Sequence, residues 1–309
     1  MKTNIIKGGI ALLLSLTLLA GCGGNAHPLL ITTCPTKATF SFTTANFTGD
    51  TFTQLLGINN MGEIAGYHGS GADPQNPNKG FTISPTGNFT NENFTNSAQT
   101  QVIAVNTNGD TAGFYVDQAG NTHGFLNAGG TFATVDAPNT IFNQLLSLND
   151  KGVAAGYSQE ANGTQHPYTV LLGNFTMITT PGASAQATGV NNRGDVSGFY
   201  VDNAAVTHGF VIPQGKTLIT VDFPQGTFTQ VLGLNNLGDA VGTYDDAGGK
   251  THGFIFNVTA VSFESIDDPK GVGTTVVNGL NDLGKIVGFS VDQAGNTNGF
   301  SAQITACQM

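Results

Sequence analysis

The chain lacks tryptophan, has a single arginine (Arg193), and carries few charges of either sign: charged residues make up 10 % of 309. Twenty acidic residues face ten basic ones, so the formal net charge is −10. Because a protein without a basic patch binds polyanions poorly, we expect no nucleic-acid partner. Beyond residue 21 there is no long helical periodicity, and short bursts rich in valine, threonine and phenylalanine predict an all-β chain.

Several signatures of enzymes are also missing. The chain has no Gly-x-Ser-x-Gly nucleophile motif, no zinc-type spacing of histidine and glutamate, and no phosphate-binding glycine loop. Sialidase-type chemistry needs an arginine cluster, which one arginine cannot supply. These absences disfavour the enzyme classes that depend on those motifs.

The first 21 residues have the pattern of a signal peptide, with a positively charged start and an apolar run over residues 8–19. The sequence Leu19-Ala20-Gly21-Cys22 resembles the lipobox of bacterial lipoproteins, which implies that Cys22 carries the lipid and begins the mature chain. An ordinary signal peptide, in which Cys22 has no special role, is the alternative. A retained transmembrane helix is disfavoured, since the run is shorter than the roughly 20 residues of a membrane span. Gly23 favours the outer membrane by the lipoprotein sorting rule. We therefore expect a protein of the bacterial cell envelope, anchored at the outer membrane or cell surface.

A motif built on Asn-x-x-Gly, with a second glycine four residues later, occurs six times. The first glycines are Gly62, Gly109, Gly152, Gly194, Gly238 and Gly284. By subtraction, neighbouring copies are 47, 43, 42, 44 and 46 residues apart. Each copy divides into a phenylalanine-rich strand a, an apolar strand b before the motif, a strand c after it, and a strand d that opens with His-Gly-Phe in several copies.

Four antiparallel strands in each of six copies predict a six-bladed β-propeller with strand b innermost. A parallel β-solenoid is the alternative, although it needs no hairpin turns. We expect three regions: the signal peptide at residues 1–21, a tether at residues 22–36 and the propeller at residues 37–307.

The ends of the repeat region predict how the ring closes. The chain begins with a spare strand a at Thr39–Phe42 and stops after a strand d, so the N-terminal strand is expected to complete the last blade. That pairing would bring Cys34 close to Cys307. In an oxidising compartment we expect the two to form a disulfide; two unpaired thiols are the alternative.

The repeat resembles the bacterial extracellular repeat called HAF, after its His-Ala-Phe signature. The resemblance covers residues 38–305 and depends on the Asn-x-x-Gly motif and on His-Gly-Phe at His123, His208 and His252, where glycine replaces the alanine of the family. The third copy departs further, with His166-Pro167-Tyr168. The resemblance implies an extracellular repeat domain and no known activity.

Polar residues of the loops are the candidates for function. Equivalent histidines on neighbouring strands d are too far apart to share one metal ion, so we expect them to pack or to cap turns. The a–b and c–d loops should share one face of the disc, with twelve acidic residues against three lysines, about −9; the b–c and d–a turns on the other face total about −2. Nine residues of the first face form the candidate binding face: Asp117, Asp136, Asp202, Asp222, Asp245, Asp246, Asp267, Asp268 and Asp292. Aspartate also favours turns for purely structural reasons, which remains the alternative.

We therefore predict a non-enzymatic binding or scaffolding module, anchored to the membrane by lipid. The alternative function is a carbohydrate-active propeller, a lyase or glycosidase, that uses aspartates of the candidate face. The expected partner is an envelope protein or glycan, and the expected oligomeric state is a monomer. We predict no cofactor; the loops match no EF-hand pattern, which leaves calcium a weak possibility.

Overall fold

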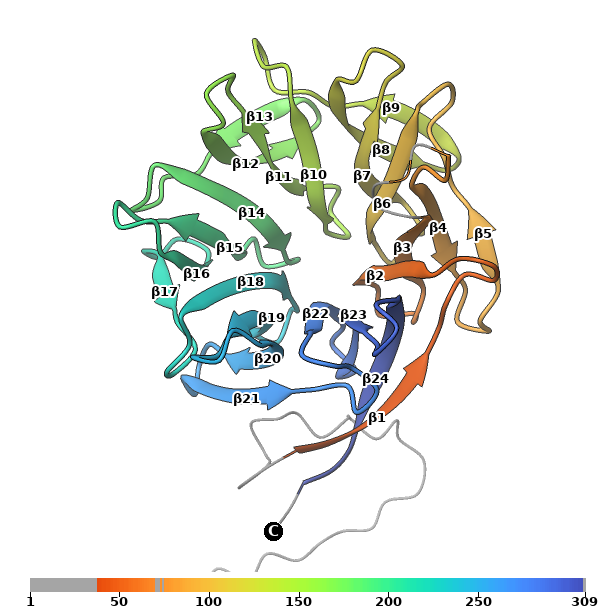
Figure 1. Cartoon of the computed structure of the whole chain (residues 1–309). Coiled ribbons are helices and arrows are strands. Elements are labelled where there is room, and N and C mark those ends of the chain that lie inside the picture. Colours follow the sequence, from red (N-terminus) through yellow and green to blue (C-terminus); the bar gives the residue numbers. More distant parts are fainter. Residues whose placement is uncertain (1–37, 70–72, 74, 308–309) are drawn as a thin grey trace, which may run out of the picture.

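The structure is a computed structural model that describes residues 38–69, 73 and 75–307. The described part contains 24 strands and no helix, in agreement with the predicted all-β class. It therefore has no helix with the length and apolarity to cross a membrane. The strands are grouped into sheets that surround a central axis, as expected for a β-propeller (Figure 1). The predicted signal peptide and tether lie outside the described residues.

Each repeat supplies its strands in the same order from the axis outward. The innermost strands are those predicted as strand b: β2 (Phe52–Ile58), β6 (Gln99–Val105), β10 (Asn143–Leu148), β14 (Ser184–Val190), β18 (Phe228–Leu234) and β22 (Thr275–Leu280). Strand c follows as β3 (Ile64–Gly69), β7 (Thr111–Val116), β11 (Ala154–Gln159), β15 (Val196–Val201), β19 (Asp239–Asp245) and β23 (Lys285–Val291). Strand d is β4 (Lys79–Ile83), β8 (Thr122–Ala128), β12 (Gln165–Leu171), β16 (Thr207–Ile212), β20 (Thr251–Asn257) and β24 (Thr297–Cys307). The outer strands are β5 (Phe89–Asn91), β9 (Thr131–Thr134), β13 (Asn174–Met177), β17 (Ile219–Val221), β21 (Ser262–Ile266) and the N-terminal β1 (Ala38–Thr44).

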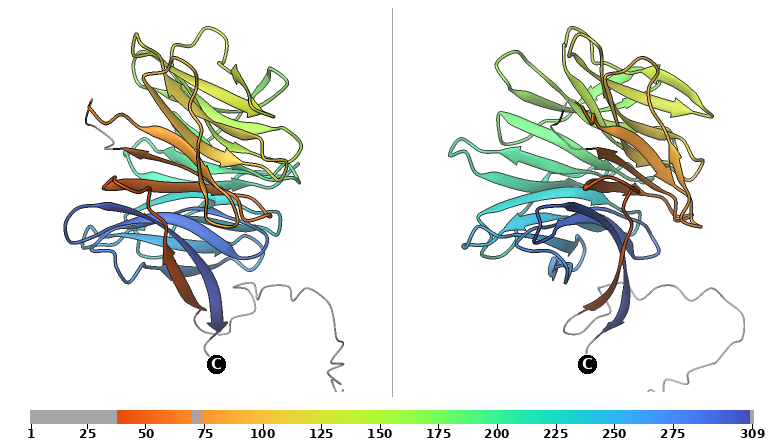
Figure 2. Two further views of the ribbon diagram at one scale, coloured as in Figure 1. Left: turned by 90° about the vertical axis from the view of Figure 1, so that its right-hand side faces the viewer. Right: turned by 45° about the vertical axis from the view of Figure 1, so that its right-hand side comes forward.

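Four of the sheets contain four strands each, and the remaining sheet runs β22-β23-β24-β2-β3-β4-β5 with β1 paired to β24. The longer sheet arises because one parallel pair, Phe52 with Thr297, links β2 to β24. The first strand of the chain thus lies antiparallel to the last, from Ala38 opposite Cys307 to Thr44 opposite Phe300. This two-stranded ribbon extends past the edge of the disc (Figure 2).

Glycine is required at the two positions of the motif for different physical reasons. The first, such as Gly238 with a φ of 93°, adopts the left-handed backbone that the b–c turn requires. The second lies where strand b bulges against strand c. A Cβ on Gly242 would lie 1.8 Å from the carbonyl oxygen of Gln230, so any side chain would break the ladder there. The four-residue spacing between the two glycines is therefore fixed by the turn at the first and the bulge at the second.

The core lies between neighbouring sheets and contains one large aromatic side chain from each strand d. These six residues are at most 1 % exposed: Phe81, Phe125, Tyr168, Phe210, Phe254 and Phe300. Each is paired with the second glycine of its motif, as Phe210 is with Gly198, so the missing side chain of the glycine leaves room for the ring. The third repeat alone places a hydroxyl group at this position.

The Tyr168 hydroxyl leads to a prediction about stability. It is buried and has no hydrogen-bond partner among the described residues. Leaving such a group unsatisfied costs about 1–3 kcal/mol. We expect Tyr168→Phe to raise the free energy of unfolding and the melting temperature, measured by thermal and denaturant unfolding.

The matched control is the reverse change at an equivalent site. Phe210→Tyr should lower the stability, because it adds a hydroxyl to a core position that is 0 % exposed. If Tyr168→Phe destabilises the protein, the hydroxyl has a partner, such as a bound water, that the sequence pattern does not reveal.

Candidate functional site

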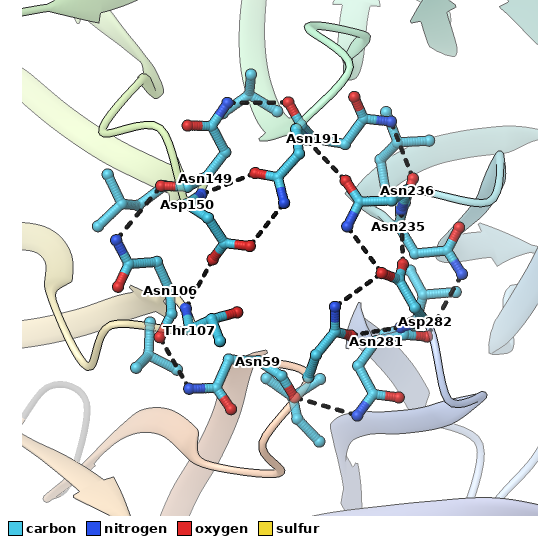
Figure 3. Close-up of a pocket in the computed structure, with 18 residues that line it drawn as sticks. Asn59, Asn106, Thr107, Asn149, Asp150, Asn191, Asn235, Asn236, Asn281 and Asp282 are labelled. Atoms are coloured by element: carbon cyan, nitrogen blue, oxygen red, sulfur yellow. Dashed lines mark hydrogen bonds between the residues drawn. The ribbon is translucent and has the colours of Figure 1, made fainter. Parts of the chain in front are cut away.

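The narrow end of the axis is formed by the asparagine of each b–c turn. We call these residues the asparagine ring: Asn59, Asn106, Asn149, Asn191, Asn235 and Asn281 (Figure 3). All six are buried. The side-chain oxygen of each accepts two backbone N–H groups of its own turn, as Asn149 does from Lys151 at 3.0 Å and Val153 at 2.9 Å. Asparagine is therefore required locally, as a cap for the turn.

The amide nitrogen of each ring residue donates to the carbonyl oxygen of the ring residue in the next repeat. The first such bond, from Asn59 to Asn106, is 2.8 Å long, and those from Asn149 to Asn191 and from Asn191 to Asn235 are both 2.9 Å. Two are longer, at 3.4 Å. The last runs from Asn281 back to Asn59 at 3.1 Å. One side-chain type thus links all six repeats in a circle.

A second set of residues follows the ring residues in sequence and surrounds the opening. We call them the narrow-mouth residues: Asn60, Thr107, Asp150, Asn192, Asn236 and Asp282. Asp150 accepts the backbone N–H of Thr107 at 2.7 Å and the amide of Asn192 at 2.6 Å. Burial alone would raise the pKa of Asp150, but these hydrogen bonds outweigh it and hold the pKa below its usual value.

Three cavities with shared lining residues follow one another along the axis. The cavity at the asparagine ring has a volume of about 80 Å³, and the one behind it about 100 Å³. The third cavity, at the beginning of the inner strands, has about 370 Å³, and we call it the wide mouth. It lies on the same side of the disc as the a–b links, so it opens among the loops of the predicted acidic face. Of these three cavities along the axis, the wide mouth alone approaches the size of a typical small-molecule site.

The wide mouth has a polar part and an apolar part, and no charged side chain lines it. The apolar part consists of Leu56, Ile103, Leu146, Leu232 and Phe199. The polar part consists of Gln186, Thr188, Gln230 and Asn278, all from repeats four to six. A charged ligand would lose hydration there without gaining a partner. The lining suits a neutral molecule that has both hydroxyl groups and an apolar face.

Some polar side chains of the wide mouth already form hydrogen bonds within the protein. Thr188 donates to the carbonyl of Val231 at 2.7 Å, and Asn278 donates to that of Leu55 at 2.9 Å, so both join neighbouring inner strands. Within the described chain, the amide of Gln230 has no such partner. It is therefore the group most available to a ligand.

The sequence did not indicate this site, although a signal was present. Three residues before the ring asparagine, the copies read Leu56, Ile103, Leu146, Thr188, Leu232 and Asn278. The two polar exceptions both line the wide mouth. A position-by-position comparison of the copies would have found them, because function in a repeat protein requires departures from the repeat.

The nine aspartates of the predicted binding face belong to repeats two, four, five and six, and each bonds groups of its own repeat. Asp117, Asp202, Asp246 and Asp292 each accept two backbone N–H groups of their own c–d loops. Asp136, Asp222 and Asp267 each lie against the histidine of their own repeat. Asp245 accepts from Thr251, and the buried Asp268 accepts from Ser290. The structural role of aspartate in turns explains most of these positions.

Three repeats contain the same carboxylate–imidazole–carboxylate bridge. In repeat two, Nδ1 of His123 lies 2.7 Å from Asp136 and Nε2 lies 3.5 Å from Asp117. His208 bridges Asp222 and Asp202, and His252 bridges Asp267 and Asp246. In the described residues, no group of three or more His, Cys, Asp or Glu side chains is arranged to hold a metal ion. Each histidine joins strand d to two loops of its own repeat.

The predicted cysteine sites are only partly within the described chain. Cys22 and Cys34 lie outside it. Cys307 is the last residue of β24, and its backbone is opposite Ala38.

Comparisons with known proteins support the fold. No protein-family model and no curated protein matches the chain. Among solved structures, it is similar to TolB from Acinetobacter baumannii (TM-score 0.53, 12 % identity, 81 % of this chain and 63 % of TolB). It is also similar to a gluconolactonase from Xanthomonas campestris (0.54, 9 %, 85 % and 89 %) and to the fungal lectin of Aleuria aurantia (0.51, 10 %, 84 % and 93 %). At these identities the likeness shows a β-propeller of four-stranded blades and nothing about activity.

The asparagine ring gives a prediction. Asn149→Ala removes two turn bonds and the bond to Asn191. At about 0.5–1.5 kcal/mol each, the three bonds should account for about 1.5–4.5 kcal/mol of unfolding free energy. Asn149→Asp keeps the acceptor for the turn but cannot donate to Asn191, so it measures the link between repeats. Asn108→Ala, at an exposed position of the neighbouring turn, is the control and should change stability by less than about 0.5 kcal/mol. Equal effects of all three changes would contradict the role of the ring.

The histidine bridges predict a pH dependence of stability. Partial burial acts to lower the pKa of His123, His208 and His252, but the hydrogen bonds and charges of their carboxylates prevail and raise it. A raised pKa in the folded state stabilises the protein below the unfolded value of about 6.5, and this contribution disappears as the pH rises through the folded value. The melting temperature should therefore be higher at about pH 5.5 than at about pH 8.5.

The sixth repeat supplies the matched variant. It has Asn298 at the histidine position, where the amide bonds Asp292 without titrating. Changing His123, His208 and His252 together to asparagine should flatten the dependence of the melting temperature between those two pH values. An unchanged slope in the triple variant would show that other groups govern it.

At lower pH, the loop aspartates determine where stability is lost. Hydrogen bonds from Asn121 lead the causes that lower the pKa of Asp117 to about 2. Its contribution to stability is therefore complete above the unfolded pKa of about 3.9 and is lost as the pH falls from there through the folded value.

Proposed function

We propose that this protein is a lipid-anchored β-propeller of the bacterial cell envelope that binds a neutral, hydroxyl-rich ligand, such as a sugar unit of a glycan, at the wide mouth of its axis. The observation that carries the ligand class is the uncharged lining of that cavity, in which amides and a hydroxyl from repeats four to six lie among aliphatic groups and Phe199. A pyranose has an apolar face and a rim of hydroxyl groups, which matches both kinds of lining group.

The architecture that we propose is a monomeric disc of six blades, closed by the N-terminal strand, over residues 37–307. The eight-stranded sheet then counts as two blades, because a single residue pair joins them. The sixth blade consists of β22, β23, β24 and β1. The pairing of β1 with β24 and the return of the asparagine ring from Asn281 to Asn59 support this count. We retain the HAF-repeat family as the origin of the repeat.

Two covalent features complete the proposal. The lipobox at residues 19–22 supports lipidation of Cys22, and labelling with a palmitate analogue that survives in Cys22→Ser would refute it. The position of Cys307 opposite Ala38, four residues after Cys34, supports a Cys34–Cys307 disulfide. Peptide mapping without reduction tests that bond, and recovery of two free thiols would exclude it.

The lectin of Aleuria aurantia is a six-bladed propeller that recognises fucose, so this architecture can accommodate a neutral sugar. The carbohydrate-active alternative receives no comparable support. Its predicted carboxylates are each bonded to their own loop, to a histidine or to a neighbouring hydroxyl group.

The ligand site is tested with a matched pair of glutamines. Gln230 lines the wide mouth, whereas Gln101 holds the equivalent position in repeat two and does not. We expect the purified protein to bind members of a panel of neutral oligosaccharides. Gln230→Ala should weaken binding by up to about tenfold in calorimetry, equivalent to the loss of one hydrogen bond. Gln101→Ala should leave the affinity unchanged. Failure to bind any neutral saccharide, or an equal loss in both variants, would contradict the proposed site.

A further inference from the structure

The third residue of each b–c turn points to a second functional surface. Around the disc these residues are Met61, Asn108, Lys151, Arg193, Leu237 and Leu283. The three apolar ones belong to repeats five, six and one, which are neighbours in the ring. Their exposed fractions are 66 % for Met61, 45 % for Leu237 and 50 % for Leu283. Large apolar side chains grouped at the tips of turns cost solvation free energy unless something covers them.

The structure holds these three turns together at one carboxylate. Asp282 precedes Leu283 and accepts the amides of Asn60 at 2.7 Å and Asn236 at 2.8 Å, which precede Met61 and Leu237. Its other oxygen accepts the backbone N–H of Asn236. The charge of Asp282 is therefore met by three N–H groups between the turns. We call Met61, Leu237 and Leu283 the apolar arc.

The apolar arc lies beside the place where the chain enters the disc. Gln303 is the last residue of β24 that pairs with β23, and its amide donates to the carbonyl of Leu283 at 3.2 Å. Beyond it, β24 pairs only with β1, as Ile304 does with Phe40. This ribbon therefore begins next to the residue that bonds Leu283, and it projects beyond the disc (Figure 2). Cys22 precedes Ala38 by 16 residues, by subtraction. Extended chain spans at most roughly 3.6 Å per residue, so a lipid on Cys22 would keep Ala38, at the start of the ribbon, within about 60 Å of the bilayer.

Charge distinguishes the two faces of the disc. The wide-mouth face carries about −9 and the face of the apolar arc about −2, counted from the loop residues of each. Membrane leaflets rich in anionic lipid repel a strongly acidic surface. A nearly neutral surface with apolar tips can instead enter the interfacial region, where buried apolar area sets the binding strength.

We propose that the apolar arc docks on the lipid bilayer, so that the narrow mouth faces the membrane and the wide mouth faces away from it. The occupant is the lipid surface itself, and the inference rests on the lipid anchor proposed above. The lipid anchor holds the disc near the membrane, and the apolar arc sets which face of the disc contacts it. The consequence for function is that the ligand site remains open to the surrounding space.

The absence of tryptophan provides a clean test. Single tryptophans are placed on the arc (Leu283→Trp or Met61→Trp) and, as a control, on the wide-mouth face (Ile141→Trp, at a site 69 % exposed in the loop before β10). The lipidated full-length chain is reconstituted in phosphatidylcholine vesicles with brominated acyl chains. We expect blue-shifted, strongly quenched emission from the arc tryptophans and unquenched emission from the control. Adding Leu283→Asp to Met61→Trp should reduce the quenching.

Flotation of the same vesicles separates the two proposals. If the protein floats but the arc tryptophans remain unquenched, or if Ile141→Trp is quenched instead, the docking surface is wrong and the anchor stands. If the protein does not float and Cys22 is not lipidated, the anchor itself fails, and the docking inference fails with it.

Discussion

The asparagine ring is the interaction on which the rest of the structure depends. Each ring residue uses its side-chain oxygen to form its own turn and its amide nitrogen to bond the next turn. Local and long-range structure therefore depend on the same side chain. Because the bonds return from Asn281 to Asn59, no repeat is left with an unpaired inner end. Aspartate could form the turn but could not donate, and alanine could do neither, which explains why all six copies have asparagine.

This constraint determines where the chain is free to vary. The ring asparagine and the two glycines are fixed by the turn, the bulge and the close approach of strand b to strand c. The residues just beside them are not fixed, because they point to the axis or to solvent. Thr188 and Asn278 differ from the aliphatic residues of the other copies and line the wide mouth. Leu237 and Leu283 occupy a turn position that is Lys151 or Arg193 elsewhere. Both candidate surfaces arise next to invariant positions of the repeat.

The sequence was sufficient to predict the strands, their order from the axis and the pairing partner of the first strand. These features depend on local signals, such as turn residues and alternation, that recur six times and so reinforce one another. Eight of the nine candidate aspartates lie in loops, as expected, and Asp245 is the last residue of β19, but their partners could not be predicted. The bridge at His123 needs Asp117 and Asp136 from two different loops, and their approach depends on the twist of the sheet. The wide mouth was missed because it depends on single departures from the repeat, which carry no periodic signal.

The two faces of the disc thus differ in chemistry, and the strand topology determines which segments lie on each face. In an antiparallel meander, the turns after the inner strands and the loops before them must lie on opposite faces. The turns contain the asparagine ring, whose hydrogen bonds leave a cavity of only about 80 Å³, so this end suits contact with a surface better than uptake of a ligand. The beginnings of the inner strands, on the side of the loops, surround the larger axial cavity, of about 370 Å³. The ribbon of β1 and β24 leaves beside the closed end. In the arrangement proposed above, an anchor at the N-terminal end of this ribbon would leave the open end facing away from the membrane.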